Sequence, residues 1–410
     1  MGLIVQKYGG SSVASPRLVQ RVAARVVAQK KKGDKVVVVV SAAGDTTDEL
    51  IALARQVTDD PPEREMDMLL STGEQRNVAI LAMAIHRLGH KAISFTGAQV
   101  GILTDRAYTK AKILDINAKR IVEELRKGRI VIVAGFQGVT LDQDITTLGR
   151  GGSDLTAVAL AKALGATMCE IYTDVEGVYT ADPRLIRNAR KLDRISYDEM
   201  LELASLGAQV MQARSMEVAK KYNVPIHVRS SFSQRPGTVI LKEAKAMEDI
   251  LVSGVTANKN EAKITIRSVP DRPGVAAKIF KEIAEKNVNI DMIIQNVSRT
   301  GTTDLSFTVP LGDLKKTLEI ARKVAHRIGA EGVTYADNIA KVSVVGVGMR
   351  SHSGIAARMF SALASKRINI EMISTSEIKI SCVINKRHAD RAVRAIHQVF
   401  QLHLPPGARK

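Results

Sequence analysis

The chain has 410 residues and a net charge of +18, from 60 basic and 42 acidic side chains. At about 100–200 residues per domain, this length predicts two to four domains, and an apolar content of 45 % excludes wholesale disorder. Aromatic residues make up only 3 % and Trp is absent, which disfavours a protein that stacks single-stranded nucleic acid on aromatic rings. Two cysteines, Cys169 and Cys382, exclude a disulfide scaffold and a Cys-rich zinc site, and we interpret them as buried residues in a reducing compartment.

Hydropathy and charge also bear on location and partners. No apolar stretch approaches the ~20 residues of a membrane helix, and no basic region followed by a long apolar stretch opens the chain. We therefore expect a cytoplasmic protein with no membrane partner. The positive charge is spread along the chain without a basic tail, so we interpret it as solvated surface and expect no nucleic-acid partner. The alternative is a basic nucleic-acid-binding protein, which would be indicated by binding to nucleic acid that weakens steeply with salt.

The first 245 residues alternate between strand and helix patterns. The predicted strands are Leu3–Tyr8, Lys35–Ser41, Lys91–Phe95, Ile130–Ala134 and Met168–Thr173. The predicted helices are Pro16–Lys32, Thr46–Val57, Glu63–Leu88, Ile113–Lys127 and Asp154–Leu164. This alternation favours an α/β domain built on a largely parallel sheet.

The C-terminal third contains an internal repeat, which follows a turn-rich connection and a predicted helical spacer at Glu243–Ile250. Asp271–Phe280 matches Ser351–Phe360, and Val288–Ile293 matches Ile368–Ile373, both at an offset of 80 residues. Each copy reads strand, glycine turn, helix, strand, strand, helix, strand. The pattern predicts two small ferredoxin-like modules of the α+β class.

A glycine-rich loop follows the first predicted strand, with the sequence Lys7-Tyr8-Gly9-Gly10-Ser11-Ser12-Val13. It is neither a P-loop nor a dinucleotide fingerprint. Paired glycines let backbone N–H groups approach an anion closely, and Lys7 can place a point charge on a phosphate. If this loop is considered alone, a turn with no ligand is the alternative to an anion-binding loop.

Two further segments strengthen the anion-binding interpretation. Gly149-Arg150-Gly151-Gly152-Ser153-Asp154 precedes a predicted helix, which Ser153 or Asp154 can cap. Capping requires neither Arg150 nor three glycines, whereas an arginine beside a helix N-terminus suits a carboxylate or phosphate. Tyr172–Arg184 follows another strand and is dense in polar and turn residues, as in a nucleotide-binding loop.

These motifs, together with Ser71-Thr72-Gly73-Glu74, resemble the aspartokinase family of the amino acid kinase superfamily. The repeat resembles the ACT domain, an amino-acid-sensing module, so that the resemblance spans essentially the whole chain. It implies an amino acid kinase-like three-layer α/β/α sandwich with a mostly parallel central sheet over residues 1–245. It further implies two ferredoxin-like ACT modules at 264–340 and 341–404.

The resemblance implies transfer of the γ-phosphoryl group of MgATP to the β-carboxylate of L-aspartate, giving 4-phospho-L-aspartate. This reaction opens lysine, threonine, methionine and diaminopimelate biosynthesis. The nucleophile is ionised at pH 7, because the pKa of a free aspartate side chain is ~3.9, so no general base is required. ATP and Mg²⁺ are the implied cofactors, and no metal site built from protein ligands alone is expected.

The family's site residues carry over to matching positions. The implied catalytic residues are Lys7, Glu74 and Asp154, where Asp154 either orients Lys7 or helps to place Mg²⁺. Arg150 is expected to bind the α-carboxylate of aspartate and Glu74 its ammonium group; a glutamate on an exposed helix surface is the alternative for Glu74. The implied aspartate contacts are Thr47, Glu74, Arg150, Gly151, Gly152 and Ser153. The implied ATP contacts are Lys7, Tyr8, Gly9, Gly10, Ser11, Ser41, Thr173, Asp174, Tyr179, Arg184 and Gln209.

Gln209 departs from the family pattern, which has lysine at this position. Glutamine can form hydrogen bonds but brings no charge, so the sequence predicts a weaker ATP contact here unless another cation substitutes.

Regulation by lysine, threonine or both is implied at the ACT modules. The implied effector contacts are Asp271, Gly274, Asn289, Ile290, Asp291, Gln295, Ser353, Gly354, Asn369, Ile370 and Glu371. A homodimer or an α2β2 assembly through the ACT modules is expected, with Met247 as a candidate internal start for a small subunit.

Two other functions remain open at this stage. Acetylglutamate, glutamate and uridylate kinases share the phosphate loops but generally lack paired ACT modules. A non-enzymatic amino-acid sensor would need no Lys7, Glu74 or Arg150, and all three are present.

Overall fold

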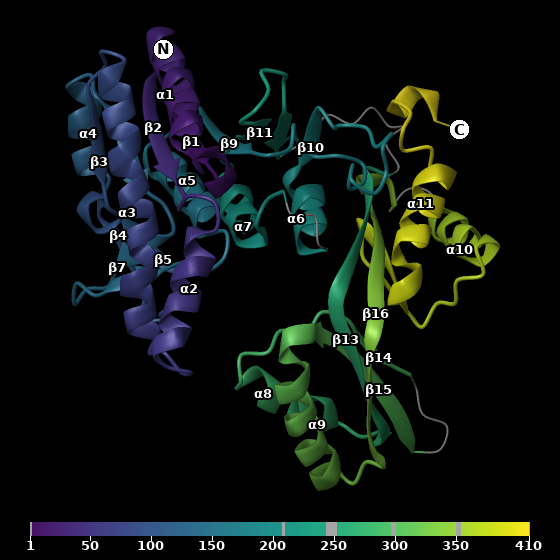
Figure 1. Cartoon of the computed structure of the whole chain (residues 1–410). Coiled ribbons are helices and arrows are strands. Elements are labelled where there is room, and N and C mark those ends of the chain that lie inside the picture. The colour runs from purple at the N-terminus through teal and green to yellow at the C-terminus, as the bar shows by residue number, and fades with distance from the viewer. Residues whose placement is uncertain (1, 207–209, 243–251, 297–300, 350–353, 410) are drawn as a thin grey trace. The chain divides into compact units, whose positions relative to one another are not determined.

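The computed structural model describes residues 2–206, 210–242, 252–296, 301–349 and 354–409 (Figure 1). The chain forms two compact units, one of residues 1–179 and 191–246, the other of residues 180–190 and 247–410. The segment 180–190 interrupts the first unit in sequence, and its Ala181 and Ile186 are buried in an apolar core of the second. The domain boundaries 1–245, 264–340 and 341–404 stay predictions. The predicted helical spacer at Glu243–Ile250 lies outside the described residues.

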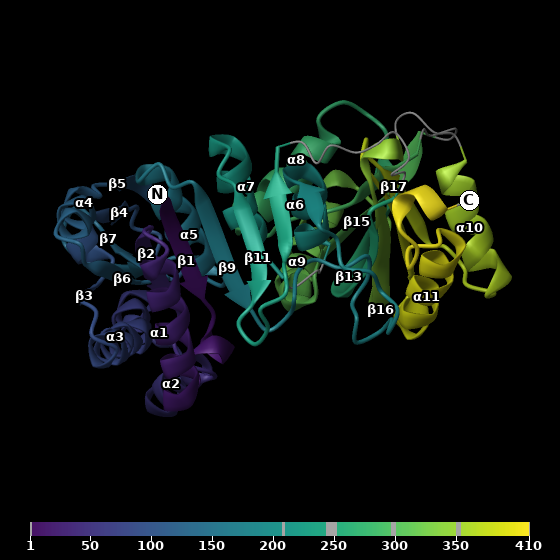
Figure 2. The same ribbon diagram turned by 90° about the horizontal axis from the view of Figure 1, so that it is seen from above.

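An eight-stranded sheet organises the first unit (Figure 2). Its order is β10-β12-β11-β9-β1-β2-β6-β3. All neighbouring strands pair in parallel except β11 and β12, which are antiparallel. The sheet is therefore mostly parallel, as predicted. The strands are β1 (Leu3–Tyr8), β2 (Lys35–Val40), β3 (Ala92–Phe95), β6 (Ile130–Ala134), β9 (Met168–Thr173), β10 (Arg194–Ser196), β11 (Ile226–Ser230) and β12 (Thr238–Leu241).

Helices cover both faces of this sheet, which makes three layers. Val36, Val38 and Val40 pack with α1 (Pro16–Lys31) and α3 (Glu63–Arg87) in one apolar core. Side chains alternate along a strand, so the intervening residues of β2 face the opposite side, where α5 (Gly152–Ala163) lies (Figure 2). The unbroken valine run of β2 is thus explained by burial on both faces.

The remaining elements of the first unit include a small second sheet of order β5-β4-β7-β8. They are α2 (Thr46–Val57), β4 (Ile102–Thr104), β5 (Ile113–Ile116), α4 (Lys119–Arg126), β7 (Gln137–Val139), β8 (Ile145–Thr147), α6 (Tyr197–Ser205) and α7 (Ala213–Tyr222), with short 3₁₀ turns at Gly10–Ser12 and Ala98–Val100.

One predicted helix is wrong in its first part. Ile113–Lys127 was expected to be helical throughout, but Ile113–Ile116 forms β5 and pairs with β4. The helix α4 begins only after Asn117, whose side-chain oxygen accepts a hydrogen bond from the backbone N–H of Lys119 at 3.3 Å. A tertiary partner strand therefore overrides the local helical pattern.

A six-stranded antiparallel sheet organises the second unit, in the order β14-β15-β13-β16-β18-β17. One apolar core packs beneath α8 and α9, and another beneath α10 and α11. The elements are β13 (Gly254–Pro270), α8 (Val275–Ala284), β14 (Ile293–Gln295), β15 (Thr302–Pro310), α9 (Leu314–Ile328), β16 (Gly332–Val345), α10 (Ile355–Ser365), β17 (Met372–Thr375), β18 (Lys379–Asn385) and α11 (Ala389–Val399), with 3₁₀ turns at Leu311–Asp313, Val347–Met349, Lys386–His388 and Pro406–Ala408.

The two repeats share their long central strands. The first repeat follows the predicted order of elements, but the second has no strand after α11 among the described residues. Its place is taken by the N-terminal part of β13, because Gly254–Asn258 pairs with the C-terminal part of β16. The expectation of a sixth element within the second copy is therefore wrong, and the repeats are interwoven through β13 and β16.

Two smaller predictions concern burial. Cys169 and Cys382 are free and buried, as predicted, and burial raises the pKa of both thiols. Within the described part of the chain, every helix is too short or too polar to cross a membrane.

Candidate functional site

Lys7 lies at the end of β1, on the sheet face that α5 covers. Its Nζ atom is 2.6 Å from Oδ1 of Asp154, and the two side chains are only 13 % and 11 % exposed. Asp154 lies in the first turn of α5. The structure thus joins two residues that are 147 positions apart and places a largely buried ammonium group beside the glycine loop. The role of Asp154 in orienting Lys7 stays a prediction, for which this ion pair provides the required geometry.

The glycine loop packs closely against the end of β9 and against the segment that follows β2. The backbone N–H of Gly9 donates to the carbonyl of Tyr172 at 3.3 Å, and that of Gly44 donates to Gly10 at 3.1 Å. A Cβ atom on Gly10 would lie 2.7 Å from the carbonyl oxygen of Ala42. The close approach of these two backbone segments therefore requires glycine at position 10, because any side chain would clash.

Other predicted ATP contacts surround this loop. The ring of Tyr8 is fully buried and stacked on Tyr172, so it points away from the loop surface. Ser11 is exposed. The backbone N–H of Ser41 donates to the carbonyl of Tyr8 at 3.1 Å, which holds the ends of β1 and β2 together.

The segment before α5 folds around two glycines with left-handed backbone conformation. Gly149 has φ 77° and Gly151 has φ 70°, and the helix starts at Gly152 with Gly151 as its N-cap. Ser153 and Asp154 were expected as possible caps, but both lie inside the first turn. Neither is used to cap the helix, and the exposed Arg150 precedes this helix N-terminus, where anions bind favourably.

Glu74 is a buried residue of α3, only 3 % exposed, so the alternative of a surface glutamate is wrong. Its Oε1 accepts a hydrogen bond from the backbone N–H of Ala42 at 3.0 Å. Its Oε2 is buried and has no hydrogen-bond partner among the described residues. Burial raises the pKa of this carboxyl to about 7. The site therefore holds an acceptor that a ligand cation would satisfy.

Thr47 lies in the first turn of α2, just after the 42–46 segment that borders Glu74. A Cβ atom on Gly73 would lie 2.9 Å from Cβ of Ala42 and 3.5 Å from Cγ2 of Thr46. The segment between β2 and α2 thus packs against the glycine loop on one side and against α3 on the other.

The predicted nucleotide loop is divided between the two compact units. Thr173 ends β9, and its hydroxyl donates to Oδ1 of Asp174 at 3.0 Å. Tyr179 bridges to Lys191 within the first unit. Arg184 belongs to the second unit, where it pairs with Asp182 at 3.0 Å and is 79 % exposed. Gln209 lies outside the described residues.

The predicted effector residues repeat one geometry in the two modules. Gly274 and Gly354 are the N-caps of α8 and α10, with φ 88° and 95°. Ser353 lies outside the described residues. The backbone N–H of Asp271 donates to Gly301 at 2.9 Å, and Gln295 ends β14. Asn289 and Asn369 lead into the corresponding outer strands, with Ile290 and Ile370 packed against the two cores.

Two of the three acidic effector residues, Asp291 and Glu371, have cationic partners in the structure. Asp291 forms an ion pair with Lys341, which also lies 2.6 Å from Glu261. Glu371 forms an ion pair with Lys263. Asp291 and Glu371, which occupy equivalent positions of the two repeats, are therefore each paired with a lysine from a central strand, β16 or β13.

Sequence reasoning missed two buried acids near the loops. Asp67 on α3 is fully buried and accepts hydrogen bonds from the backbone N–H groups of Thr109 and Thr147, which anchors β8 just before the Arg150 segment. Glu170 occupies the middle of β9 and contacts Gln6 and Arg229. For Glu170, the available signal was a charged residue inside a mostly apolar strand.

Among the described residues, no group of three or more His, Cys, Asp and Glu side chains could hold a metal ion. The carboxylate of Asp154 lies beside Lys7. Mg²⁺ is commonly bound by one or two carboxylates together with substrate phosphates and water. The donor set thus fits a magnesium ion that arrives with a nucleotide.

Known protein families and relatives match almost the whole length of the chain. The family description "Amino acid kinase family" matches residues 2–230, and two ACT domain descriptions match residues 264–326 and 342–400. The aspartokinase of Pseudomonas aeruginosa is 54 % identical over 407 residues, covering 99 % of both chains. That of Mycobacterium tuberculosis is 53 % identical over 407 residues, covering 98 % of this chain and 97 % of its own.

Solved structures agree with these relatives. Escherichia coli aspartokinase III in complex with aspartate and ADP matches with a TM-score of 0.84 at 25 % identity, covering 97 % of this chain and all of that chain. The same enzyme with lysine and aspartate matches with a TM-score of 0.73 at 25 % identity, covering 97 % of this chain and 99 % of its own. The amino acid kinase fold with C-terminal ACT domains, expected from the motifs, is thereby confirmed.

Proposed function

The chain belongs to the aspartokinase family, and from this membership we propose that it transfers the γ-phosphoryl group of MgATP to the β-carboxylate of L-aspartate. The product is 4-phospho-L-aspartate, which opens lysine, threonine, methionine and diaminopimelate biosynthesis. The enzyme acts in the cytoplasm, a compartment where free thiols such as Cys169 and Cys382 stay reduced.

The observation that carries this proposal is the unpaired Oε2 of Glu74. A buried carboxylate oxygen without a donor is costly, and the ammonium group of an amino-acid substrate would satisfy it. Arg150, exposed before α5, is the proposed partner of the α-carboxylate. Thr47, Gly151, Gly152 and Ser153 complete the proposed aspartate contacts.

The residues at the strand ends suit phosphoryl transfer by positioning and charge neutralisation. Lys7 is the proposed contact of the transferring phosphate, and its ion pair with Asp154 fixes the ammonium group beside the glycine loop. Mg²⁺, when bound with ATP, neutralises phosphate charge, and the proposed role of Asp154 is either to orient Lys7 or to help hold this ion. The attacking carboxylate is ionised at pH 7, so the chain needs no general base.

Nucleotide binding is proposed at the ends of β1, β2 and β9. The proposed contacts are Tyr8 through its backbone, Gly9, Gly10, Ser11, Ser41, Thr173, Asp174, Tyr179, Arg184 and Gln209. The E. coli relative solved with ADP supports a nucleotide site in this family.

We propose feedback inhibition by lysine, threonine or both at the ACT modules, with subunits joined through these modules as a homodimer or as an α2β2 assembly. The lysine complex of the E. coli relative supports an amino-acid effector. The candidate internal start at Met247 lies outside the described residues.

A substrate panel tests the reaction. ADP release in a coupled assay is measured with L-aspartate, L-glutamate, N-acetyl-L-glutamate and UMP as acceptors. Turnover with aspartate alone is expected, and turnover with one of the other acceptors instead would contradict the proposal. Titration of the aspartate reaction with lysine, threonine and their mixture then tests regulation, and a flat response to all three would remove the proposed effectors.

A further inference from the structure

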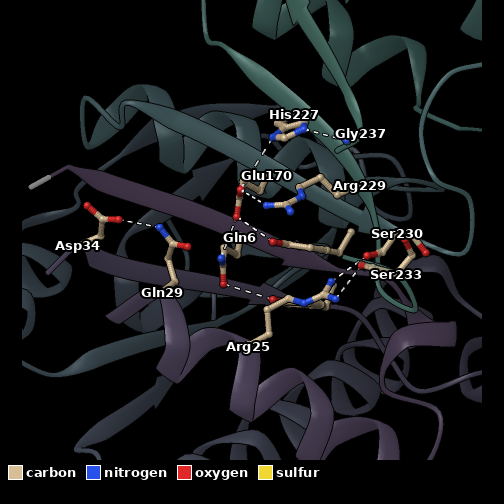
Figure 3. A network of polar contacts seen from close by, with 12 residues as sticks. Gln6, Arg25, Gln29, Asp34, Glu170, His227, Arg229, Ser230, Ser233 and Gly237 are labelled. Atoms are coloured by element: carbon tan, nitrogen blue, oxygen red, sulfur yellow. Dashed lines mark hydrogen bonds and ion pairs between the residues drawn. The ribbon is translucent and has the colours of Figure 1, made fainter. Parts of the chain in front are cut away.

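A ladder of polar side chains crosses three neighbouring strands of the eight-stranded sheet (Figure 3). The strand register places Gln6 of β1 beside Glu170 of β9, and Glu170 beside His227 of β11. Because side chains alternate along a strand, Lys7 points to the other face, where Asp154 lies. The proposed reaction uses none of these three ladder residues.

Glu170 is the centre of this ladder, and its side chain is 8 % exposed. Its Oε2 accepts hydrogen bonds from Nε2 of Gln6 at 2.8 Å and from the hydroxyl of Tyr172 at 3.0 Å. Its Oε1 accepts from Nη1 of Arg229 at 3.0 Å. One carboxylate thus ties together β1, β9 and β11. Such a buried charge persists only when well-placed donors surround it.

A second row of side chains lies one step nearer the strand ends. Tyr8 and Tyr172 stack with ring centroids 4.7 Å apart and an interplanar angle of 6°. The guanidinium groups of Arg25 and Arg229 lie 4.8 Å and 5.6 Å from the centroid of the Tyr172 ring. The tyrosine pair is therefore held between the Glu170 carboxylate and two cations, an arrangement in which each contact orients the next.

Arg25 extends the network to the end of β11 and the loop that follows it, residues 230–233, as Figure 3 shows. Its guanidinium donates to the carbonyls of Ser230 at 2.8 Å and Ser233 at 3.0 Å. Within this loop, the hydroxyl of Ser231 lies 2.5 Å from that of Ser12 in the glycine loop. The backbone N–H of Ser231 donates to the carbonyl of Thr173 at 2.8 Å.

We propose that Glu170 is a positioning residue for the nucleotide, acting through Tyr172, Arg229 and Arg25 on the glycine loop and on Thr173. The residues that follow the stacked tyrosines in sequence are Gly9 and Thr173, so any shift of the stacked pair moves both loops. The proposal rests on the proposed function, since it takes these loops as the ATP site. Aspartate binding at Glu74 and Arg150 is outside this network.

Glu170→Gln tests the role of the charge, because glutamine keeps the size of the side chain and removes its negative charge. The matched control is Glu124→Gln on α4. Glu124 is equally buried, with a side chain 9 % exposed, and is paired with Lys127 at 2.7 Å and Arg129 at 2.6 Å. The control thus loses a buried, doubly paired carboxylate that has no contact with either loop.

The measurements are KM for ATP, KM for aspartate and calorimetric titration of the full chain with MgADP. For Glu170→Gln we expect KM for ATP and Kd for MgADP to rise about ten-fold, with KM for aspartate unchanged. The Glu124 control should change none of the three. An equal rise of both KM values, or a change of neither, would overturn the proposal.

Arg25→Met keeps the inference testable if Glu170→Gln fails to fold, since Arg25 is half-buried on α1 and methionine preserves most of its packing. The same selective rise of KM for ATP is expected, and an unchanged value would contradict the network. If the wild-type chain fails to phosphorylate aspartate, the proposed function is wrong, whereas the MgADP titrations still decide the role of Glu170.

Discussion

Replacing Glu74 by glutamine should make the protein more stable at pH 8 while weakening its binding of aspartate. The carboxyl is 3 % exposed, one of its oxygens has no donor, and burial raises its pKa to about 7. At pH 5 the folded protein holds this group protonated, and glutamine resembles that neutral form. At pH 8 the group is ionised without a compensating cation, which costs free energy. Replacement by glutamine removes this cost.

The size of the effect follows from the pKa. A folded-state pKa of about 7 against an ordinary value of 4.5 corresponds to roughly 3 kcal/mol at 1.36 kcal/mol per unit. Because burial raises the pKa of Glu74, the folded state binds this proton more tightly than the unfolded state. The stability gained from the protonated carboxyl is fully present below pH 4.5 and is lost as pH rises through 7. The Glu74→Gln variant should therefore match the wild type near pH 5 and exceed it by up to roughly 3 kcal/mol at pH 8.

Denaturant unfolding of both proteins at pH 5 and pH 8 measures the stability difference. The kinetic counterpart is kcat/KM for aspartate, which should fall about ten-fold per pH unit below 7 in the wild type as Glu74 is protonated. In Glu74→Gln it should be low and independent of pH over this range. Equal destabilisation of the variant at both pH values, together with unchanged kcat/KM, would refute the reasoning.

Three further substitutions follow from the geometry. Lys7→Ala should lower kcat by about 10²–10³ with an unchanged circular dichroism spectrum, because it removes the cation proposed for the transferring phosphate. Turnover equal to that of the wild type would contradict that role. Gly10→Ala should raise KM for ATP, since its Cβ would lie 2.7 Å from a backbone carbonyl oxygen, whereas Gly312→Ala meets no atom within 4 Å and should leave KM unchanged. Lys341→Met leaves two acids without their shared cation and should destabilise the protein by about 3–5 kcal/mol in denaturant unfolding. Lys259→Met breaks the exposed ion pair between Lys259 and Asp390 and should cost under about 1 kcal/mol. Equal losses of stability in the Lys341 and Lys259 variants would contradict the burial argument.

Much of the fold follows from local patterns in the sequence. The valine run at Val36–Val40 and the apolar strand Ile130–Ala134 are read directly, because strands buried on both faces are continuously apolar. Pro16 after Ser15 marks the start of α1, where the Ser15 hydroxyl accepts from the backbone N–H of Leu18. Ile113–Ile116 misled the prediction because its pairing partner, β4, decides its conformation.

The interweaving of the two repeats could not be read from the sequence. The 80-residue offset identifies the copies but not which strand completes each sheet, and Gly254–Asn258 lies before the first copy as the repeat defines it. Only the pairing of β13 with β16 shows that the second repeat takes its remaining strand from upstream.

The candidate site divides in the same way. Lys7, Gly10 and Asp154 lie in motifs whose local chemistry indicates an anion site, and the structure brings Lys7 and Asp154 into contact. Glu170 lies in no motif. Its role depends on the register of three strands that are far apart in the chain, and that register is a property of the folded sheet.

The most direct test of the central claim is detection of the acyl phosphate itself. The full-length protein is incubated with L-aspartate, MgATP and hydroxylamine, and aspartyl hydroxamate is measured by its colour with iron(III) and by mass. The account predicts hydroxamate formation that requires both aspartate and ATP and is lost in Lys7→Ala. ATP-dependent hydroxamate formation from N-acetyl-L-glutamate or L-glutamate but not from L-aspartate, or full activity in Lys7→Ala, would contradict it.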